Sequence, residues 1–139
     1  MKKNGFSFIE ILVVTTIIAV LTAVGVANYR VANQKSRDGK RKGDLEQIRA
    51  ALELYRTDQK AYPTTWPGSG EALLFGGVIY MADIPDDPVN DYSYVYSSAP
   101  DGSTYSLGAY LELAKIDESS LTGCSAESGD CNYQITNPL

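Results

Sequence analysis

One acidic residue, Glu10, lies inside an apolar run that extends from Phe6 to Ala27. It is the only charged residue in that run. A carboxylate in the middle of a membrane is unfavourable by about 3 kcal/mol on insertion scales, so such residues usually have a function. The alternative is a signal anchor that tolerates an acid near the membrane interface. We therefore treat Glu10 as a candidate functional residue.

Cys124 and Cys131 are the only cysteines in the chain. Their spacing differs from the Cys-x-x-Cys motif of redox and zinc sites. A disulfide between them would close a short loop and stabilise the fold by roughly 2–3 kcal/mol. Such a bond is typical of proteins outside the cytoplasm. Two free thiols in a cytosolic domain are the alternative.

Acidic residues near the C-terminus could bind calcium, a hard cation that prefers several oxygen ligands. The candidates are Asp117, Glu118, Glu127 and Asp130. They lack the spacing of an EF-hand, and the cysteine pair could hold this region instead. We expect no other metal and no cofactor.

Enzymatic chemistry has little support. The chain contains no histidine, which excludes a Ser-His or Cys-His nucleophile pair and a histidine metal site. Hydrolysis by two carboxylates needs only acids, and residues 61–139 contain eleven of them. No pair is distinguished by its spacing. We predict that the protein is not an enzyme.

Charge is distributed unevenly along the chain, whose net charge is −5. Residues 28–60 contain nine basic and five acidic side chains, whereas residues 61–139 contain one basic side chain, Lys115. The basic run Arg37-Asp38-Gly39-Lys40-Arg41-Lys42 could neutralise phosphates of a nucleic acid. It has no aromatic residue on which bases could stack. A solvated helix face, or a contact with acidic heads, is therefore favoured over nucleic-acid binding.

The elements that would position these residues begin with one long helix. The 22 residues of the apolar run would extend about 33 Å as a helix, enough to cross a membrane. Leu45, Ile48, Leu52 and Tyr55 then recur at helical spacing, which predicts an amphipathic helix over residues 28–60. We expect both halves to form one helix that ends near residues 58–60.

A small antiparallel sheet is expected to cover that apolar helix face, giving an α+β fold. Tyrosines alternate with smaller residues in 92–97, and a second alternating run covers 105–111, so the two predict a hairpin. Residues 133–135 could add a third strand. The tyrosines are expected on a half-buried sheet face rather than on a binding surface. Ser69 could cap a short helix over residues 71–75.

Two features of the sequence disagree about which side of the membrane the C-terminal part occupies. Two lysines precede the apolar run, whereas six basic residues follow it between positions 30 and 42. Counted simply, the positive-inside rule places the C-terminal part in the cytoplasm. The cysteine pair favours the opposite side.

The N-terminus resembles type IV pilins and the pseudopilins of type II secretion. In that family a short basic leader ends in glycine and is followed by Phe, three mostly apolar residues, Glu and an apolar helix. Here Lys2-Lys3-Asn4-Gly5 precedes Phe6-Ser7-Phe8-Ile9-Glu10. The segment after the long helix, Tyr62-Pro63-Thr64-Thr65, resembles that of major pseudopilins. Asp87-Pro88, before the tyrosine run, resembles both pseudopilin heads and small type IV pilins of the Gram-positive kind.

This resemblance implies the pilin fold and a class III prepilin leader, residues 1–5. A prepilin peptidase would cut between Gly5 and Phe6 and N-methylate Phe6. Residues 6–27 would form the membrane span and later the filament core, residues 28–60 the amphipathic half, and residues 61–139 a globular head with a C-terminal disulfide loop. Glu10 would pair with the Phe6 amine of a neighbouring subunit, because two opposite charges cost less free energy to bury in an apolar core as a pair than singly.

The resemblance also implies partners and a location. The protein would be a homo-oligomer, a helical filament, and before assembly a single-pass protein of the bacterial inner membrane with a cytoplasmic N-terminus and an external head. Its partners would be the prepilin peptidase, an assembly platform and ATPase, and minor pilins. The filament could serve secretion, adhesion, motility or DNA uptake. The competing hypothesis is a membrane-anchored extracytoplasmic ligand-binding module that does not polymerise.

Overall fold

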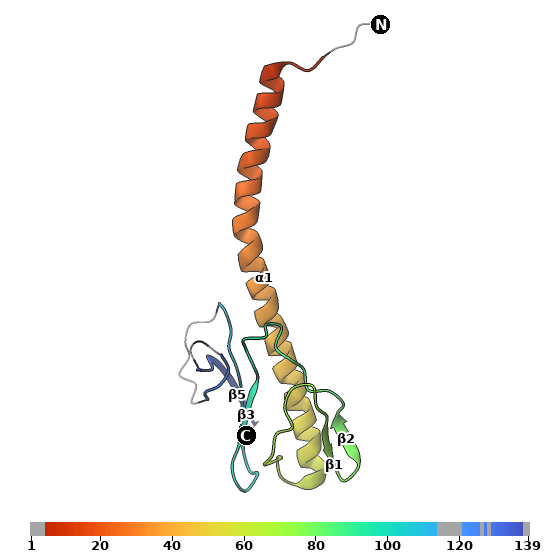
Figure 1. The fold of residues 1–139 in the computed structure, drawn as a ribbon. Helices are drawn as coiled ribbons and strands as arrows, with labels where there is room; N and C mark the ends of the chain where they lie inside the picture. The colour runs from red at the N-terminus through yellow and green to blue at the C-terminus, as the bar shows by residue number, and fades with distance from the viewer. Residues whose placement is uncertain (1–4, 114–120, 126, 128, 138–139) are drawn as a thin grey trace. The chain divides into compact units, whose positions relative to one another are not determined.

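The structure, a computed structural model, describes residues 5–113, 121–125, 127 and 129–137. Helix α1 (Phe8–Gln59) is followed by short strands, as Figure 1 shows. The strands are β1 (Leu73–Phe75), β2 (Val78–Met81), β3 (Val95–Ser98), β4 (Tyr105–Ala109) and β5 (Tyr133–Thr136). The predicted α+β class is confirmed. The chain divides into a helical unit that ends at Lys35 and a head unit that begins at Ser36.

Most of the helical unit, from Phe8 to Val26, is apolar around its circumference except for Glu10 and three threonines. Its large apolar side chains are exposed, for example Phe8, Ile18 and Val24. Thr15, Thr16 and Thr22 donate their hydroxyls to backbone carbonyls three or four residues earlier in the helix. These hydroxyls are therefore satisfied within the helix. The segment is long and apolar enough to cross a membrane.

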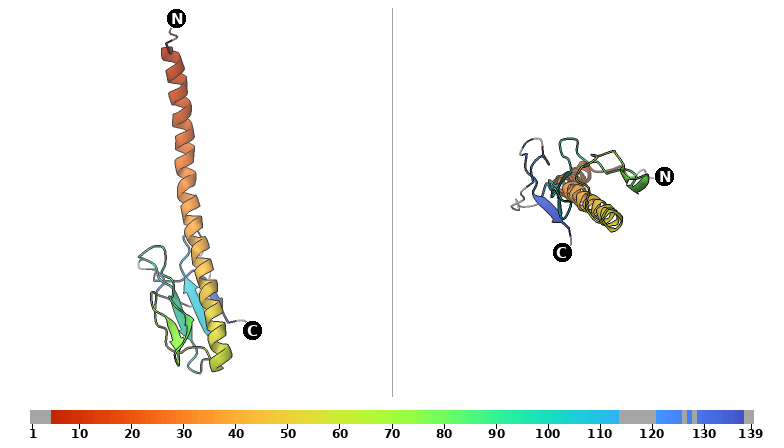
Figure 2. Two further views of the ribbon diagram at one scale, coloured as in Figure 1. Left: turned by 90° about the vertical axis from the view of Figure 1, so that its right-hand side faces the viewer. Right: turned by 90° about the horizontal axis from the view of Figure 1, so that it is seen from below.

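The head unit has its core between α1 and the sheets. Leu45, Ile48, Leu52 and Tyr55 are all buried there. They pack with Leu107 and other apolar residues of the strands in one cluster. Burying one such side chain contributes about 1.5–3 kcal/mol, so this helix face holds the head onto α1. Figure 2 shows the strands beside the C-terminal part of the helix.

The larger sheet is antiparallel with the order β3-β4-β5. Leu107 of β4 pairs with Tyr96 of β3 and with Ile135 of β5. The predicted hairpin and third strand are therefore present. Strand β3 begins only at Val95, because Tyr92 instead forms an isolated bridge with Ser125 of the C-terminal region.

Most of the alternating tyrosines belong to the core rather than to an exposed binding surface. Tyr94 and Tyr105 are buried, and Tyr96 is half-buried. The Tyr96 ring stacks on Trp66 with centroids 4.7 Å apart, and its hydroxyl donates to the Pro63 carbonyl at 2.7 Å. These contacts fasten the loop after α1 to the sheet.

The prediction of a short helix over residues 71–75 is wrong. Residues 73–75 form β1, which pairs antiparallel with β2. Gly76 and Gly77 connect the two strands with φ values of 58° and 85°. Two successive residues with positive φ form the tight turn that suits a hairpin, and glycine adopts this conformation without strain. The glycine pair therefore decides the structure of this segment.

Candidate functional site

The N-terminal end of the chain has a capped helix behind an extended segment. Gly5, Phe6 and Ser7 precede the first helical residue, Phe8, and are exposed. The Ser7 backbone N–H donates to Glu10 Oε2 at 3.4 Å, and the Glu10 N–H donates to the Ser7 carbonyl at 3.1 Å. A carboxylate at the third position of a helix stabilises the N-terminus of that helix. Among the described residues, the Glu10 side chain thus has only this one long hydrogen bond.

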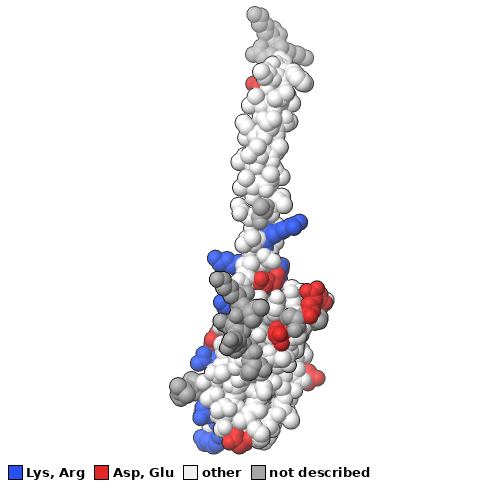
Figure 3. Space-filling model, turned by 90° about the vertical axis from the view of Figure 1, so that its left-hand side faces the viewer, with Lys and Arg blue, Asp and Glu red and all other residues white. Residues whose placement is uncertain are grey.

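The surface behind Glu10 is suited to lipid or to other helices. Charged side chains gather on the head and the segment next to it, whereas the N-terminal helix is almost entirely uncharged (Figure 3). A helix that is apolar on every side must be buried in a membrane or among other helices. The structure therefore provides a surface for insertion or assembly, with one acid near its end.

The head contains a buried ionic cluster centred on Arg41, which is 0% exposed. Its Nε and Nη2 donate to the two carboxylate oxygens of Asp87 at 2.7 and 2.9 Å. Its Nη1 donates to Asp38 at 2.8 Å and to Glu112 at 3.0 Å. The Arg41 guanidinium also lies 5.0 Å from the centre of the Tyr92 ring. One helical side chain thus holds the loop at Asp87 and the segment after β4.

The other side of the cluster fixes the chain at residues 112–113. Arg37 Nε donates to Glu112 Oε1 at 2.6 Å, and its Nη2 donates to the second oxygen. Asp38 accepts the backbone N–H groups of Glu112 and Leu113 at 2.9 and 3.0 Å. Every acid in this cluster is therefore paired or hydrogen-bonded, as burial requires.

These contacts shift the pKa values of the charged groups. The hydrogen bond from Arg37 is the main reason why the pKa of Glu112 falls to about 2, and Arg41 lowers it further. Burial acts to lower the pKa of Arg41, but the hydrogen bonds that it donates to Asp87, Glu112 and Asp38 outweigh this effect and raise the pKa. Both shifts favour the charged forms of Glu112 and Arg41 at neutral pH.

Of the two alternatives expected for residues 37–42, contact with the acidic head applies to Arg37 and Arg41, whereas Lys40 and Lys42 lie on an exposed helix face. The sequence did contain a signal for this cluster. Arg41 lies four residues before Leu45 and therefore shares the buried face of the helix. The acidic partners are far away in the sequence, so the pairs themselves could not be predicted.

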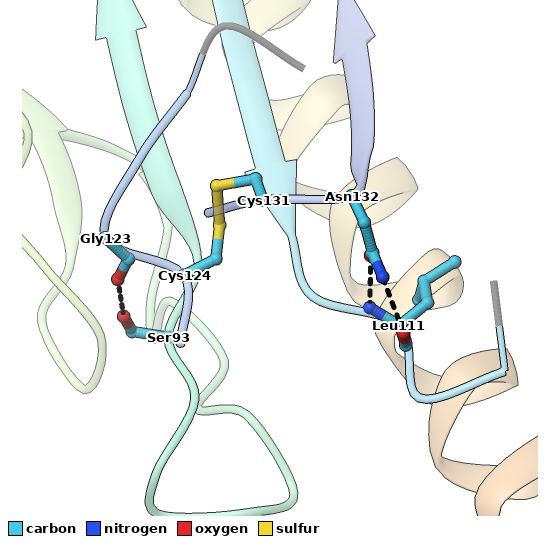
Figure 4. Close-up of a disulfide and its surroundings, with 6 residues drawn as sticks. All are labelled: Ser93, Leu111, Gly123, Cys124, Cys131 and Asn132. Atoms are coloured by element: carbon cyan, nitrogen blue, oxygen red, sulfur yellow. Dashed lines mark hydrogen bonds between the residues drawn. A yellow bond between two sulfur atoms is a disulfide. The ribbon is translucent and has the colours of Figure 1, made fainter. Parts of the chain in front are cut away.

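Cys124 and Cys131 form the predicted disulfide, with Cα atoms 5.0 Å apart. Figure 4 shows it next to β4, where Asn132 exchanges two hydrogen bonds with the backbone of Leu111 at 2.6 and 2.7 Å. A Cβ at Gly108 would lie 3.0 Å from the Cys131 sulfur. The disulfide thus closes a loop within the C-terminal region, and Cys131 packs closely against β4.

The calcium candidates are not gathered in the described part of the chain. Asp117 and Glu118 lie outside the described residues, whereas Glu127 and Asp130 are exposed. No three His, Cys, Asp or Glu side chains among the described residues lie close enough to hold a metal ion. Calcium binding remains a prediction.

The chain is similar in sequence to known proteins, both at its N-terminus and over most of its length. The family described as "Prokaryotic N-terminal methylation motif" matches residues 1–26. Type II secretion system core protein G of Pseudomonas aeruginosa is 33% identical over 121 residues, which cover 78% of this chain and 84% of that protein. The chain belongs to the core protein G family. The Vibrio cholerae protein is 30% identical and covers 96% of this chain and 94% of its own. The Escherichia coli K12 protein is 32% identical, with coverages of 73% and 84%. No solved structure matches the chain.

Core protein G proteins are the major pseudopilins, so the predicted resemblance is confirmed. Membership and the methylation motif together support a structural subunit of a type IV pilus-like filament. Neither finding favours the ligand-binding module.

Proposed function

We propose that this protein is the main structural subunit of a type II secretion pseudopilus, assembled through its apolar helix. The observation that carries the proposal is one acid, Glu10, which lies in an exposed apolar helix and inside the stretch, residues 1–26, that matches the N-terminal methylation motif. The subunit has a structural role, and we propose that it has no catalytic activity of its own.

Processing is proposed to begin with cleavage between Gly5 and Phe6. Both residues lie in an exposed, non-helical segment before α1, the conformation in which a peptidase can bind a backbone. Cleavage by the prepilin peptidase would create an amine at Phe6, which the same enzyme would methylate. The new N-terminus would lie two residues before the helix.

Assembly is proposed to depend on the positive charge of the new amine at Phe6. Before cleavage, the described part of the chain offers the Glu10 side chain only the 3.4 Å hydrogen bond from Ser7. A protonated Phe6 amine of a neighbouring subunit would offer a shorter, charge-assisted hydrogen bond. In an apolar filament core this pairing would outweigh the weak internal contact, because an unpaired charge there is costly. The acid would thus set the axial position of each new subunit.

The proposed topology places the N-terminus in the cytoplasm and the head outside the inner membrane. The disulfide supports an external head, because such bonds persist in oxidising compartments. Assembly would then require a platform protein, an ATPase that drives the filament, and minor pilins. Nucleic acid is not among the proposed partners, since Arg37 and Arg41 are occupied by acids of the head.

Mass spectrometry of the protein extracted from membranes of cells that contain the peptidase tests the proposal. We expect a chain that begins at Phe6 and carries one methyl group. An intact Met1 in all of the membrane-extracted protein would refute it. Topology is tested separately with alkaline phosphatase fused after Pro138: enzyme activity supports an external head, and activity of only a cytoplasmic reporter contradicts it.

A further inference from the structure

A groove on α1 lies where the apolar segment meets the first basic residue after it. It is open, has a volume of about 370 Å³, and is lined by Thr22, Gly25, Val26, Tyr29 and Arg30. Spacings of three and four place these residues on one face of the helix. Gly25 and Val26 are apolar, and Tyr29 and Arg30 follow them toward the C-terminal end of this face. The groove therefore combines an apolar part with a polar, cationic end.

Gly25 keeps the floor of the groove open. A Cβ added at this position would meet no atom within 4 Å. Packing inside the chain therefore does not require glycine here, although glycine weakens a helix relative to alanine. Because no contact within the chain requires glycine at this position, the space above Gly25 is suited to a group from another molecule.

The polar end of the groove has the chemistry of a membrane–water boundary. Tyr29 is 68% exposed, and tyrosine with an apolar ring and a polar tip is enriched at that boundary. Arg30 is the first charged residue after Glu10. The next acid in the sequence, Asp38, is engaged by Arg41 in the head unit. Arg30 thus faces solvent or lipid as a cation without an acidic neighbour in its own unit.

We propose that this groove binds one phospholipid, with the first part of an acyl chain over Gly25 and Val26 and the phosphate at Arg30 and Tyr29. A second copy of the chain is the competing occupant. Two copies in one membrane carry Arg30 at the same depth, however, and like charges repel. A phosphate supplies the opposite charge, and an anionic lipid gains more than a zwitterionic one. The inference requires residues 6–27 to span the membrane, but it does not require polymerisation.

Native mass spectrometry of the full chain in detergent, titrated with phosphatidylglycerol or phosphatidylcholine, tests the proposal. We expect about fivefold tighter binding of phosphatidylglycerol, the gain from one basic side chain near an anionic surface. Arg30→Gln should remove this preference, and Gly25→Leu should weaken the binding of both lipids by filling the groove. Lys35→Gln is the matched control, because Lys35 is exposed in the same unit but does not line the groove.

Several results would overturn the proposal. Equal binding of the two lipids by the native chain would do so, as would an equal loss of preference in Arg30→Gln and Lys35→Gln. A loss in Lys2→Gln/Lys3→Gln alone would place the lipid at the leader instead. If the groove variants altered only energy transfer between labelled copies, the groove would belong to a second copy. Leader cleavage and filament yield are measured on the same variants, and a failure there counts against the proposed function alone.

Discussion

Replacing Arg41 with methionine should strongly destabilise the head. The side chain is fully buried and donates four hydrogen bonds to three carboxylates. Methionine fills a similar space but leaves Asp87, whose side chain is 1% exposed, without its cation. Removing one partner of a buried ion pair costs about 3–5 kcal/mol. For a domain of this size, each kcal/mol lowers Tm by about 4–8 °C, so we expect a decrease of roughly 12–40 °C.

The assay is urea and thermal unfolding of the full chain in detergent, followed by the near-ultraviolet circular dichroism of the tyrosines in the head. Lys40→Met is the matched control: the residue is the helical neighbour of Arg41, but it is exposed, and we expect a change within about 0.5 kcal/mol. Arg41→Lys keeps the charge but loses the two-pronged contact with Asp87, so its effect should be intermediate.

A double variant separates the ion pair from simple packing. Adding Asp87→Asn to Arg41→Met removes the uncompensated charge, so the double variant should be more stable than Arg41→Met alone. A loss below about 1 kcal/mol in Arg41→Met, or equal losses in Arg41→Met and Lys40→Met, would refute the argument that this cluster holds the head onto the helix.

Three further predictions concern other parts of the chain. The pKa of Glu112 is lowered to about 2 in the folded head, so its contribution to stability is present above its ordinary pKa and is lost as the pH falls toward 2; urea unfolding at several pH values should show this loss, and Glu112→Gln should flatten it. Replacing both Cys124 and Cys131 with serine should lower the free energy of unfolding by about 2–3 kcal/mol, and a chain equally stable with and without reductant would contradict this. Glu10→Val should leave leader cleavage largely intact but severely reduce filament yield; normal filaments by electron microscopy would exclude the proposed charge pairing.

The sequence predicted what depends on local periodicity. The helix ends at Gln59, within the expected range, and Leu45, Ile48 and Leu52 occupy the buried face that their spacing indicates. The hairpin of β3 and β4 followed from alternation in the same way. Features with one repeating pattern could be predicted because a helix or strand imposes its period on the residues that it buries.

What depends on contacts distant in the sequence was missed or misassigned. Nothing near Asp87 or Glu112 in the chain indicates that Arg41 lies between them, because the fold alone brings these segments together. Residues 71–75 were assigned to a helix from a capping residue and an apolar run. The structure instead follows the Gly76-Gly77 turn, whose positive φ values favour a hairpin over a continuing helix.

The positive-inside rule carries little weight for this chain, for a physical reason. Arg37 and Arg41 are paired with acids only after the head has folded, so all six basic residues between positions 30 and 42 are uncompensated while the chain inserts. The positive-inside rule holds for connecting segments up to about 60 residues, whereas longer domains are translocated largely regardless of charge. The chain after residue 27 has 112 residues, so the rule does not decide its side. In the folded head, ion pairs neutralise Arg37 and Arg41, and they supply the partners that the buried Arg41 requires.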